Sequence, residues 1–172
     1  TYIDNMQKDQ SEIYYITGMD LDSLEKNPAL EIFKKKELNV LYLTDPVDEI
    51  VLDHLREYEG KKFKAVSSAD LKLDEKEKAD DDKDLKKDAD NFAGYLKTIY
   101  GEKVADVKVS ERLVDSPCIL VSQAEGPSVQ MEKMMKMMNK DYAYAKRVFE
   151  INQNNDLIKE LIRIHQKDPA SE

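Results

Sequence analysis

The charged stretch at residues 67–90 limits the folds open to this 172-residue chain more than any other feature. It contains ten acidic residues and six lysines, and little apolar content precedes Leu85. A segment of this composition buries too little apolar surface to offset the entropy of ordering it. We therefore expect residues 67–82 to be a solvated acidic linker and the domain boundary, with residues 1–66 and 83–172 as the units on either side.

The unit before the linker alternates strand and helix signals. Apolar, β-branched or aromatic residues at 13–17, 38–43 and 62–66 predict three strands, and the strand at 38–43 is apolar enough to be covered on both faces. Asn27-Pro28 and Asp45-Pro46 each place a capping side chain before a helix-initiating proline. Helices between successive strands are typical of a parallel or mixed sheet, so we expect a small αβα layer unit of the α/β class.

The unit after the linker mixes helices and strands without strict alternation, which predicts an α+β domain. Helices are expected from apolar residues at helical spacing, and strands from short apolar or alternating segments. The expected elements are helices at 85–100, 128–138 and 156–165 and strands at 104–109, 118–122 and 147–151.

Composition excludes several classes of function. Lys plus Arg number 27 against 36 Asp plus Glu, a net charge of -9, which is unsuited to binding nucleic acid. No apolar run approaches the roughly 20 residues of a membrane span, so we expect a cytoplasmic protein. The five glycines are scattered singly, which argues against a phosphate-binding loop. Both histidines stand alone, and Cys118 lies in an apolar strand where a small buried thiol is expected. We therefore expect no enzyme activity, cofactor or metal within these residues.

A run of methionines stands out from this background. Five of the seven methionines fall at residues 131–138, and four of them lie at i, i+3, i+4 and i+7 on one stripe of a helix: Met131, Met134, Met135 and Met138. Thioether side chains repack against apolar partners of different shapes, so an exposed stripe would suit a surface that holds varied segments. The same spacing would also serve a helix that fills its own domain core, and the spacing alone leaves both readings open.

The motifs of the chain resemble those of the heat shock protein 90 family of molecular chaperones. They occur in the family's order along nearly the whole chain except the acidic linker, and the short loops favour the bacterial form. The matching segments are residues 12–18 (EIYYITG), 34–36 (KKK), 40–49 (VLYLTDPVDE), 55–62 (LREYEGKK), 107–118 (VKVSERLVDSPC), 131–136 (MEKMMK) and 149–152 (FEIN).

The resemblance implies the end of the family's middle domain, a charged connection and a C-terminal domain without its final dimerisation helices. The family remodels partly folded client proteins with ATP and Mg, and its ATP site belongs to a separate N-terminal domain. By resemblance, this fragment would not hydrolyse ATP. The parent protein would be a homodimer that cochaperones can join, and the fragment a monomer.

The resemblance also suggests which residues meet a client protein. Carried over by motif, with Met138 added from the stripe, the client-binding residues are Met131, Met134, Met135, Met138, Glu49 and Ile50. The family often has a large apolar residue where Pro127 stands and an aromatic one at Ile50, so less aromatic contact area is available here. The alternative is a structural connector that relays ATP-state changes toward the dimer end and binds no client itself.

Overall fold

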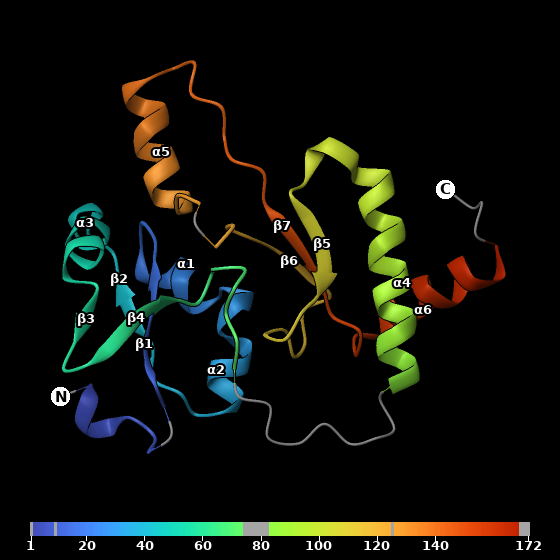
Figure 1. Cartoon of the computed structure of the whole chain (residues 1–172), viewed down its shortest axis with the longest axis horizontal. Helices are drawn as coiled ribbons and strands as arrows, with labels where there is room; N and C mark the ends of the chain where they lie inside the picture. The colour runs from blue at the N-terminus through green and yellow to red at the C-terminus, as the bar shows by residue number, and fades with distance from the viewer. Residues whose placement is uncertain (1, 9, 74–82, 125, 169–172) are drawn as a thin grey trace.

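The computed structural model describes residues 2–8, 10–73, 83–124 and 126–168, which form two β-sheets with helices around them (Figure 1). The first sheet is mixed and mainly parallel, and its strands alternate with helices. The second combines parallel and antiparallel pairing and packs against long helices. This confirms the predicted α/β unit followed by an α+β domain. Within the described ranges, no helix combines the length and apolar character needed to cross a bilayer.

The first sheet has the strand order β2-β1-β4-β3. Its strands are β1 (Glu12–Thr17), β2 (Leu41–Leu43), β3 (Glu57–Tyr58) and β4 (Lys61–Ala65). β1 is central, runs parallel to both β2 and β4, and buries Ile13 and Ile16. The segment expected to be a fully covered strand at 38–43 pairs only over Leu41–Leu43 and is half-buried, because β2 lies at the edge of the sheet.

The helices of this unit are η1 (Ile3–Asn5), α1 (Leu21–Glu25), η2 (Pro28–Leu30), α2 (Glu31–Lys35) and α3 (Pro46–Leu55). Of these, η2 and α3 begin at the prolines of the two cap-plus-proline pairs, as predicted. The Asn27 side chain accepts a hydrogen bond from the Ala29 amide at 2.9 Å, and the Asp45 side chain accepts one from the Val47 amide at 3.0 Å. Leu30 and Phe33 fill the core under the sheet.

The second sheet has the order β5-β7-β6, with β5 (Asp106–Val109) parallel and β6 (Cys118–Val121) antiparallel to β7 (Val148–Ile151). α4 (Lys83–Tyr100), followed by η4 (Gly101–Lys103), packs on β5 and against α6 (Asp156–Lys167). Cys118 is exposed, which corrects the expected buried thiol. β6 lies at the sheet edge, and the face that carries Cys118 also leaves Leu120 exposed.

The start of the expected acidic linker is packed against the first core. Leu71 and Leu73 are buried there, and Ser68 forms a parallel bridge with Ser122, just after β6. Apolar residues at every second position give this segment a buried face that the surrounding charges conceal in the sequence. Residues 74–82 lie outside the described residues, and the division into two units remains a prediction.

Arg112, in the loop between β5 and β6, joins the two halves of the chain. Its guanidinium donates hydrogen bonds to both carboxylate oxygens of Glu150 at 2.9 Å, and it also donates to the carbonyls of Val66 and Ser68. Arg112 and Glu150 are only 2% and 1% exposed. Ser110 donates a further hydrogen bond to Glu150 at 2.8 Å, so the buried carboxylate is well satisfied.

Glu31, the first residue of α2, forms a second link between the halves. Its carboxylate accepts hydrogen bonds from the amides of Val114, Asp115 and Ser116 at 2.6, 2.9 and 3.1 Å. Burial alone would raise the pKa of Glu31, but the hydrogen bonds from Ser116, Val114 and Asp115 outweigh burial and lower it. An ionised carboxylate in α2 therefore holds the loop that leads into β6.

Candidate functional site

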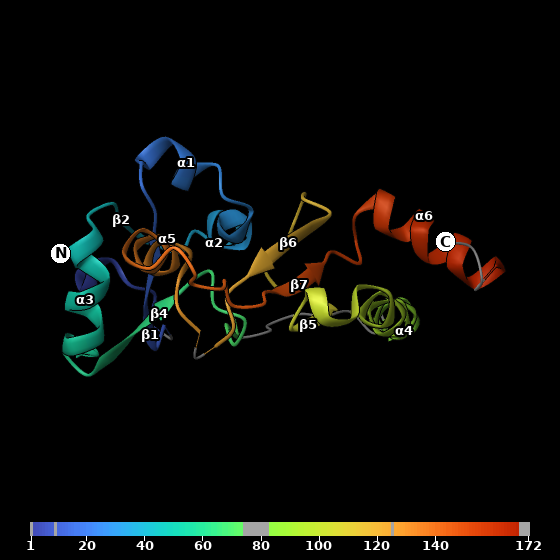
Figure 2. The ribbon, with the colours of Figure 1, turned by 90° about the horizontal axis from the view of Figure 1, so that it is seen from above.

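α5 (Val129–Met138) carries the methionine stripe and lies beside α3 of the first unit (Figures 1 and 2). In both views it stands away from the second sheet, although it comes from the same half of the chain as that sheet. Ser128 caps the helix, because its hydroxyl accepts a hydrogen bond from the Met131 amide at 3.0 Å. The helix ends at Met138, as its sequence predicts.

The stripe becomes more exposed toward the end of α5. Met131 and Met134 are half-buried, Met135 is 37% exposed and Met138 is 84% exposed. Met137, which lies off the stripe, is 79% exposed. None of the four stripe side chains is buried, so the stripe does not fill the core of this chain.

α3 presents apolar side chains of its own on the neighbouring surface. Val47, Ile50, Val51 and Leu55 are each between 42% and 51% exposed, and their spacing places them on one side of the helix. The exposed apolar side chains of α3 and the methionines of α5 lie on two helices that contact each other, and we call these two sets of side chains together the α3–α5 surface. Surfaces of this kind commonly mark sites where other proteins bind.

Glu49 ties α3 to its neighbours. Its carboxylate accepts hydrogen bonds from the hydroxyl of Thr17 in β1 and from the hydroxyl of Ser128 at 2.6 Å. Glu49 is half-buried, and these two bonds occupy both of its oxygens. Because Ser128 also caps α5, Glu49 fixes the start of the methionine helix relative to α3.

A groove of about 430 Å³ opens between β1, α3 and the start of α5. Its walls include Thr17, Glu49, Ser128, Met131 and Met135. The structure thus brings Glu49 together with two of the predicted methionines, and Ile50 lies one residue further along α3. The groove offers thioether and hydroxyl groups but no cluster that suggests covalent chemistry. Among the described residues, no group of three His, Cys, Asp or Glu side chains could hold a metal ion.

The inner side of α5 is anchored by a buried charge that the sequence does not reveal. Glu132 is fully buried, accepts a hydrogen bond from the Ala145 amide at 2.5 Å, and pairs with Arg147. Arg147 also donates to the hydroxyl of Ser122, and its burial lowers its pKa. Glu132 appears in the sequence as one more charge flanking the methionines, and the only hint of its role is its place in the first turn of the helix.

Comparison with known proteins places the whole chain in one family. The model of the Hsp90 (heat shock protein 90) family matches residues 1–172. The chain is similar to a chaperone protein HtpG of Geobacter metallireducens, with 38% identity over 99% of this chain and 27% of that protein. An endoplasmin homolog of Arabidopsis thaliana is 42% identical over 99% of this chain and 21% of its own length. A mitochondrial heat shock protein 90-6 of Arabidopsis thaliana is 36% identical over 99% and 22%. The chain therefore spans about a quarter of the length of these relatives.

Proposed function

The chain belongs to the Hsp90 family, as the resemblance of its motifs predicts, and from this premise we propose that it is a chaperone segment that holds partly folded client proteins on the α3–α5 surface. The observation that carries the proposal is the exposure of methionine side chains on α5, a helix that contacts α3. A client protein that is partly folded exposes apolar segments of many shapes. Unbranched thioethers can adapt to such segments, since three rotatable bonds let each side chain fill an irregular gap.

We propose different roles for the six client-binding residues. Ile50, Met135 and Met138 are exposed and would make direct apolar contact, while Met131 and Met134 would form the floor on which a client segment lies. Glu49 is engaged with Thr17 and Ser128, so its contribution would be to position the two helices. Its negative charge at the groove would also favour client segments that carry Lys or Arg.

We propose that the rest of the chaperone cycle depends on parts of the parent protein outside this segment. ATP with Mg would bind in a domain that this quarter-length segment does not span, and dimerisation and cochaperone contacts belong to the same parent. A cytoplasmic location is part of this proposal, although one relative is named as mitochondrial.

Loss of the stripe tests the proposal. We expect the double variant Met131→Ser and Met135→Ser to bind a reduced and alkylated, permanently unfolded protein about thirtyfold more weakly, because each thioether contributes roughly 1 kcal/mol of apolar burial. The thermal transition should stay nearly unchanged, because neither side chain belongs to the buried core. Fluorescence anisotropy of the labelled unfolded protein measures binding, and circular dichroism measures the transition.

A matched control removes apolar surface elsewhere. Leu157→Ser combined with Leu161→Ser takes two exposed leucines from α6, at the far end of the molecule from α5 (Figure 2). This variant should bind the unfolded protein as the wild type does. Equal loss in both double variants would mean that binding follows general surface hydrophobicity, and loss of several kcal/mol of stability in the methionine variant would mean that these side chains support the fold.

The second candidate is a connector that transmits movements between neighbouring parts of the parent protein. The contacts of Arg112 and Glu31 across the two halves favour it, because they make the segment suitable for passing on a rotation. A connector alone would show no saturable binding when the 172-residue chain is titrated with the unfolded protein. Saturable binding that the methionine variant loses would favour the client-holding function.

A further inference from the structure

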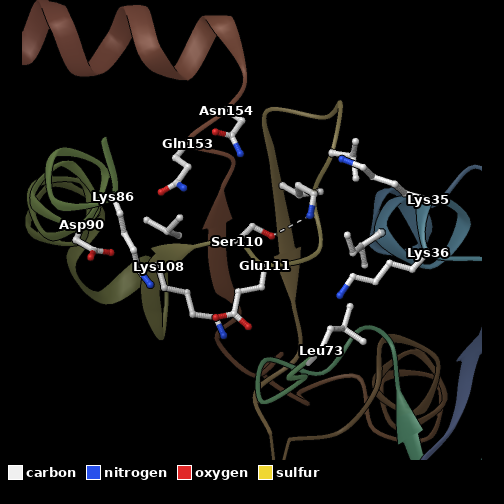
Figure 3. A pocket seen from close by; sticks show the side chains of 14 residues that line it. Lys35, Lys36, Leu73, Lys86, Asp90, Lys108, Ser110, Glu111, Gln153 and Asn154 are labelled. Carbon is white, nitrogen blue, oxygen red and sulfur yellow. Dashed lines mark hydrogen bonds between the residues drawn. The ribbon is translucent and has the colours of Figure 1, made fainter. Parts of the chain in front are cut away.

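We propose that the pocket between α2, α4 and the β5–β6 loop binds an acidic peptide segment, separately from the α3–α5 surface. The pocket has a volume of about 700 Å³, within the range typical of sites for small ligands and short peptide segments. Figure 3 shows Lys35 and Lys36 of α2 on one side and Lys86 and Asp90 of α4 on the other. The pocket thus lies where the two halves of the chain meet.

The charge of this pocket is opposite to that of the chain. Four lysines line it, Lys35, Lys36, Lys86 and Lys108, against the two acids Asp90 and Glu111, whereas the whole chain has a net charge of -9. Lys108 is engaged with Glu150 and with the carbonyl of Ala69. Within the described part of the chain, Lys35 and Lys86 form no ion pair. Two cations on opposite walls therefore remain available for a carboxylate partner.

Gln153 adds an independent sign that a ligand binds here. Gln153 is 8% exposed, and its buried side-chain Oε1 accepts no hydrogen bond from any residue that the structure describes. Such an acceptor carries an unrecovered desolvation cost, which a donor supplied by a ligand would offset. Figure 3 shows the Gln153 side chain on the α4 side of the pocket, near Lys86. A peptide N–H is a donor of the required kind.

The remaining lining favours a peptide over a simple anion. Ile32, Leu73 and Leu113 supply apolar contacts between the charged walls, and a phosphate group offers nothing to them. Asp90 and Glu111 would repel a densely charged polyphosphate. A peptide with alternating glutamate and leucine residues would place carboxylates near Lys35 and Lys86, leucines on the apolar lining, and a main-chain N–H at Gln153.

Fluorescence anisotropy tests the site with a defined probe. The probe is a fluorescein-labelled heptapeptide with alternating Glu and Leu, capped at both ends, and its companion carries Gln in place of each Glu. We expect the wild-type chain to bind the Glu peptide at least about tenfold more tightly than the Gln peptide at low salt, with an affinity that falls as salt rises. Equal binding of the two peptides would overturn the proposed recognition of carboxylates.

Variants locate the binding. Lys35→Glu combined with Lys86→Glu should weaken binding of the Glu peptide by about tenfold or more, because both walls become repulsive. The control Lys26→Glu with Lys87→Glu makes the same change in net charge outside the pocket, at two exposed lysines, and should alter binding less than about twofold. Gln153→Leu should weaken binding about fivefold, the loss expected for one hydrogen bond.

The outcomes that would overturn the site are distinct from those that concern the α3–α5 surface. If Lys26→Glu with Lys87→Glu weakens binding as much as the pocket variant does, the peptide is attracted by the overall charge of the chain and not by the pocket. Displacement of the peptide by equimolar inorganic tripolyphosphate would indicate a simple anion site. Unaltered binding by Gln153→Leu would remove the amide from the proposal. If Lys35→Glu with Lys86→Glu lowers the melting temperature, Lys35→Gln with Lys86→Gln should still weaken binding of the peptide about threefold, and failure to do so would refute the role of the lysines.

Discussion

Removing Arg112 gives the most direct test of how the two halves are held together. Arg112→Met keeps most of the apolar length of the side chain but deletes the guanidinium. Among the described residues, Glu150 then stays buried with Ser110 and Lys108 as its remaining partners, and the carbonyls of Val66 and Ser68 each lose the hydrogen bond from Arg112. Breaking a buried ion pair from one side typically costs about 3–5 kcal/mol. That is a large part of the roughly 5–15 kcal/mol that stabilises a typical domain.

Equilibrium urea unfolding, followed by circular dichroism, measures this cost. We expect the free energy of unfolding to fall by about 3–5 kcal/mol in Arg112→Met. The double variant Arg112→Met with Glu150→Met should recover most of the loss, because no uncompensated charge remains in the interior. As a control, Arg163→Met breaks a solvent-exposed pair with Glu160 and should leave the free energy of unfolding nearly unchanged.

Two results would contradict this reasoning. A loss below about 1 kcal/mol in Arg112→Met would mean that water or a neighbouring side chain replaces the guanidinium without difficulty. A double variant no more stable than the single one would mean that the contribution comes from the contacts of Arg112 with the backbone and not from the charge of Glu150.

Three further perturbations have expected outcomes. The pKa of Glu31 is lowered in the folded state. The stabilisation from its ionised carboxylate should therefore be complete above its unfolded pKa of about 4.3 and lost as pH falls through its folded pKa. The difference in unfolding free energy between wild type and Glu31→Gln should accordingly shrink, and not grow, when it is measured from pH 7 down to pH 3. Gly18→Ala would place a Cβ 2.6 Å from the buried Leu24 side chain and should destabilise the chain by about 1–3 kcal/mol in thermal unfolding, whereas an unchanged melting temperature would show that Leu24 moves freely. Glu132→Leu leaves Arg147 half-buried without its partner and should increase amide hydrogen exchange in α5 while α4 stays protected; equal exchange in both helices would contradict a local anchoring role.

Local signals in the sequence predict the elements that have their own caps and periodicity. The Asp45-Pro46 start places α3 correctly, because a capping side chain and a fixed proline φ act within a few residues. The helix predicted at 128–138 likewise agrees with α5 (Val129–Met138) to within one residue at each end. α1 and β3 were not predicted, since their five and two residues are too short to show a period.

What the sequence conceals is contact between distant segments. Leu71 and Leu73 look solvated among charges, yet they are buried because the first core has room for them. Cys118 looks buried in an apolar strand, yet it is exposed because it lies on the face of β6 that also leaves Leu120 exposed, whereas Val121 on the other face is buried. The pairing of Glu132 with Arg147 spans fifteen residues of chain and is visible only once α5 and β7 are placed. Spacing within one helix gives the methionine stripe and the resemblance to the Hsp90 family gives Glu49 and Ile50, whereas only the fold gives the exposure of these side chains.

The hydrogen bond between Glu49 and Ser128 couples rotation of the two halves of the chain to the shape of the groove between α3 and α5. Glu49 belongs to the N-terminal half and Ser128 to the C-terminal half. If one half rotates against the other, either α3 and α5 move together or this hydrogen bond breaks. In the first case the mouth of the groove keeps its width, and in the second it widens. A single hydrogen bond between a hydroxyl and a carboxylate thus couples the relative orientation of the two halves to the width of the groove, and so to how tightly the groove can bind a ligand.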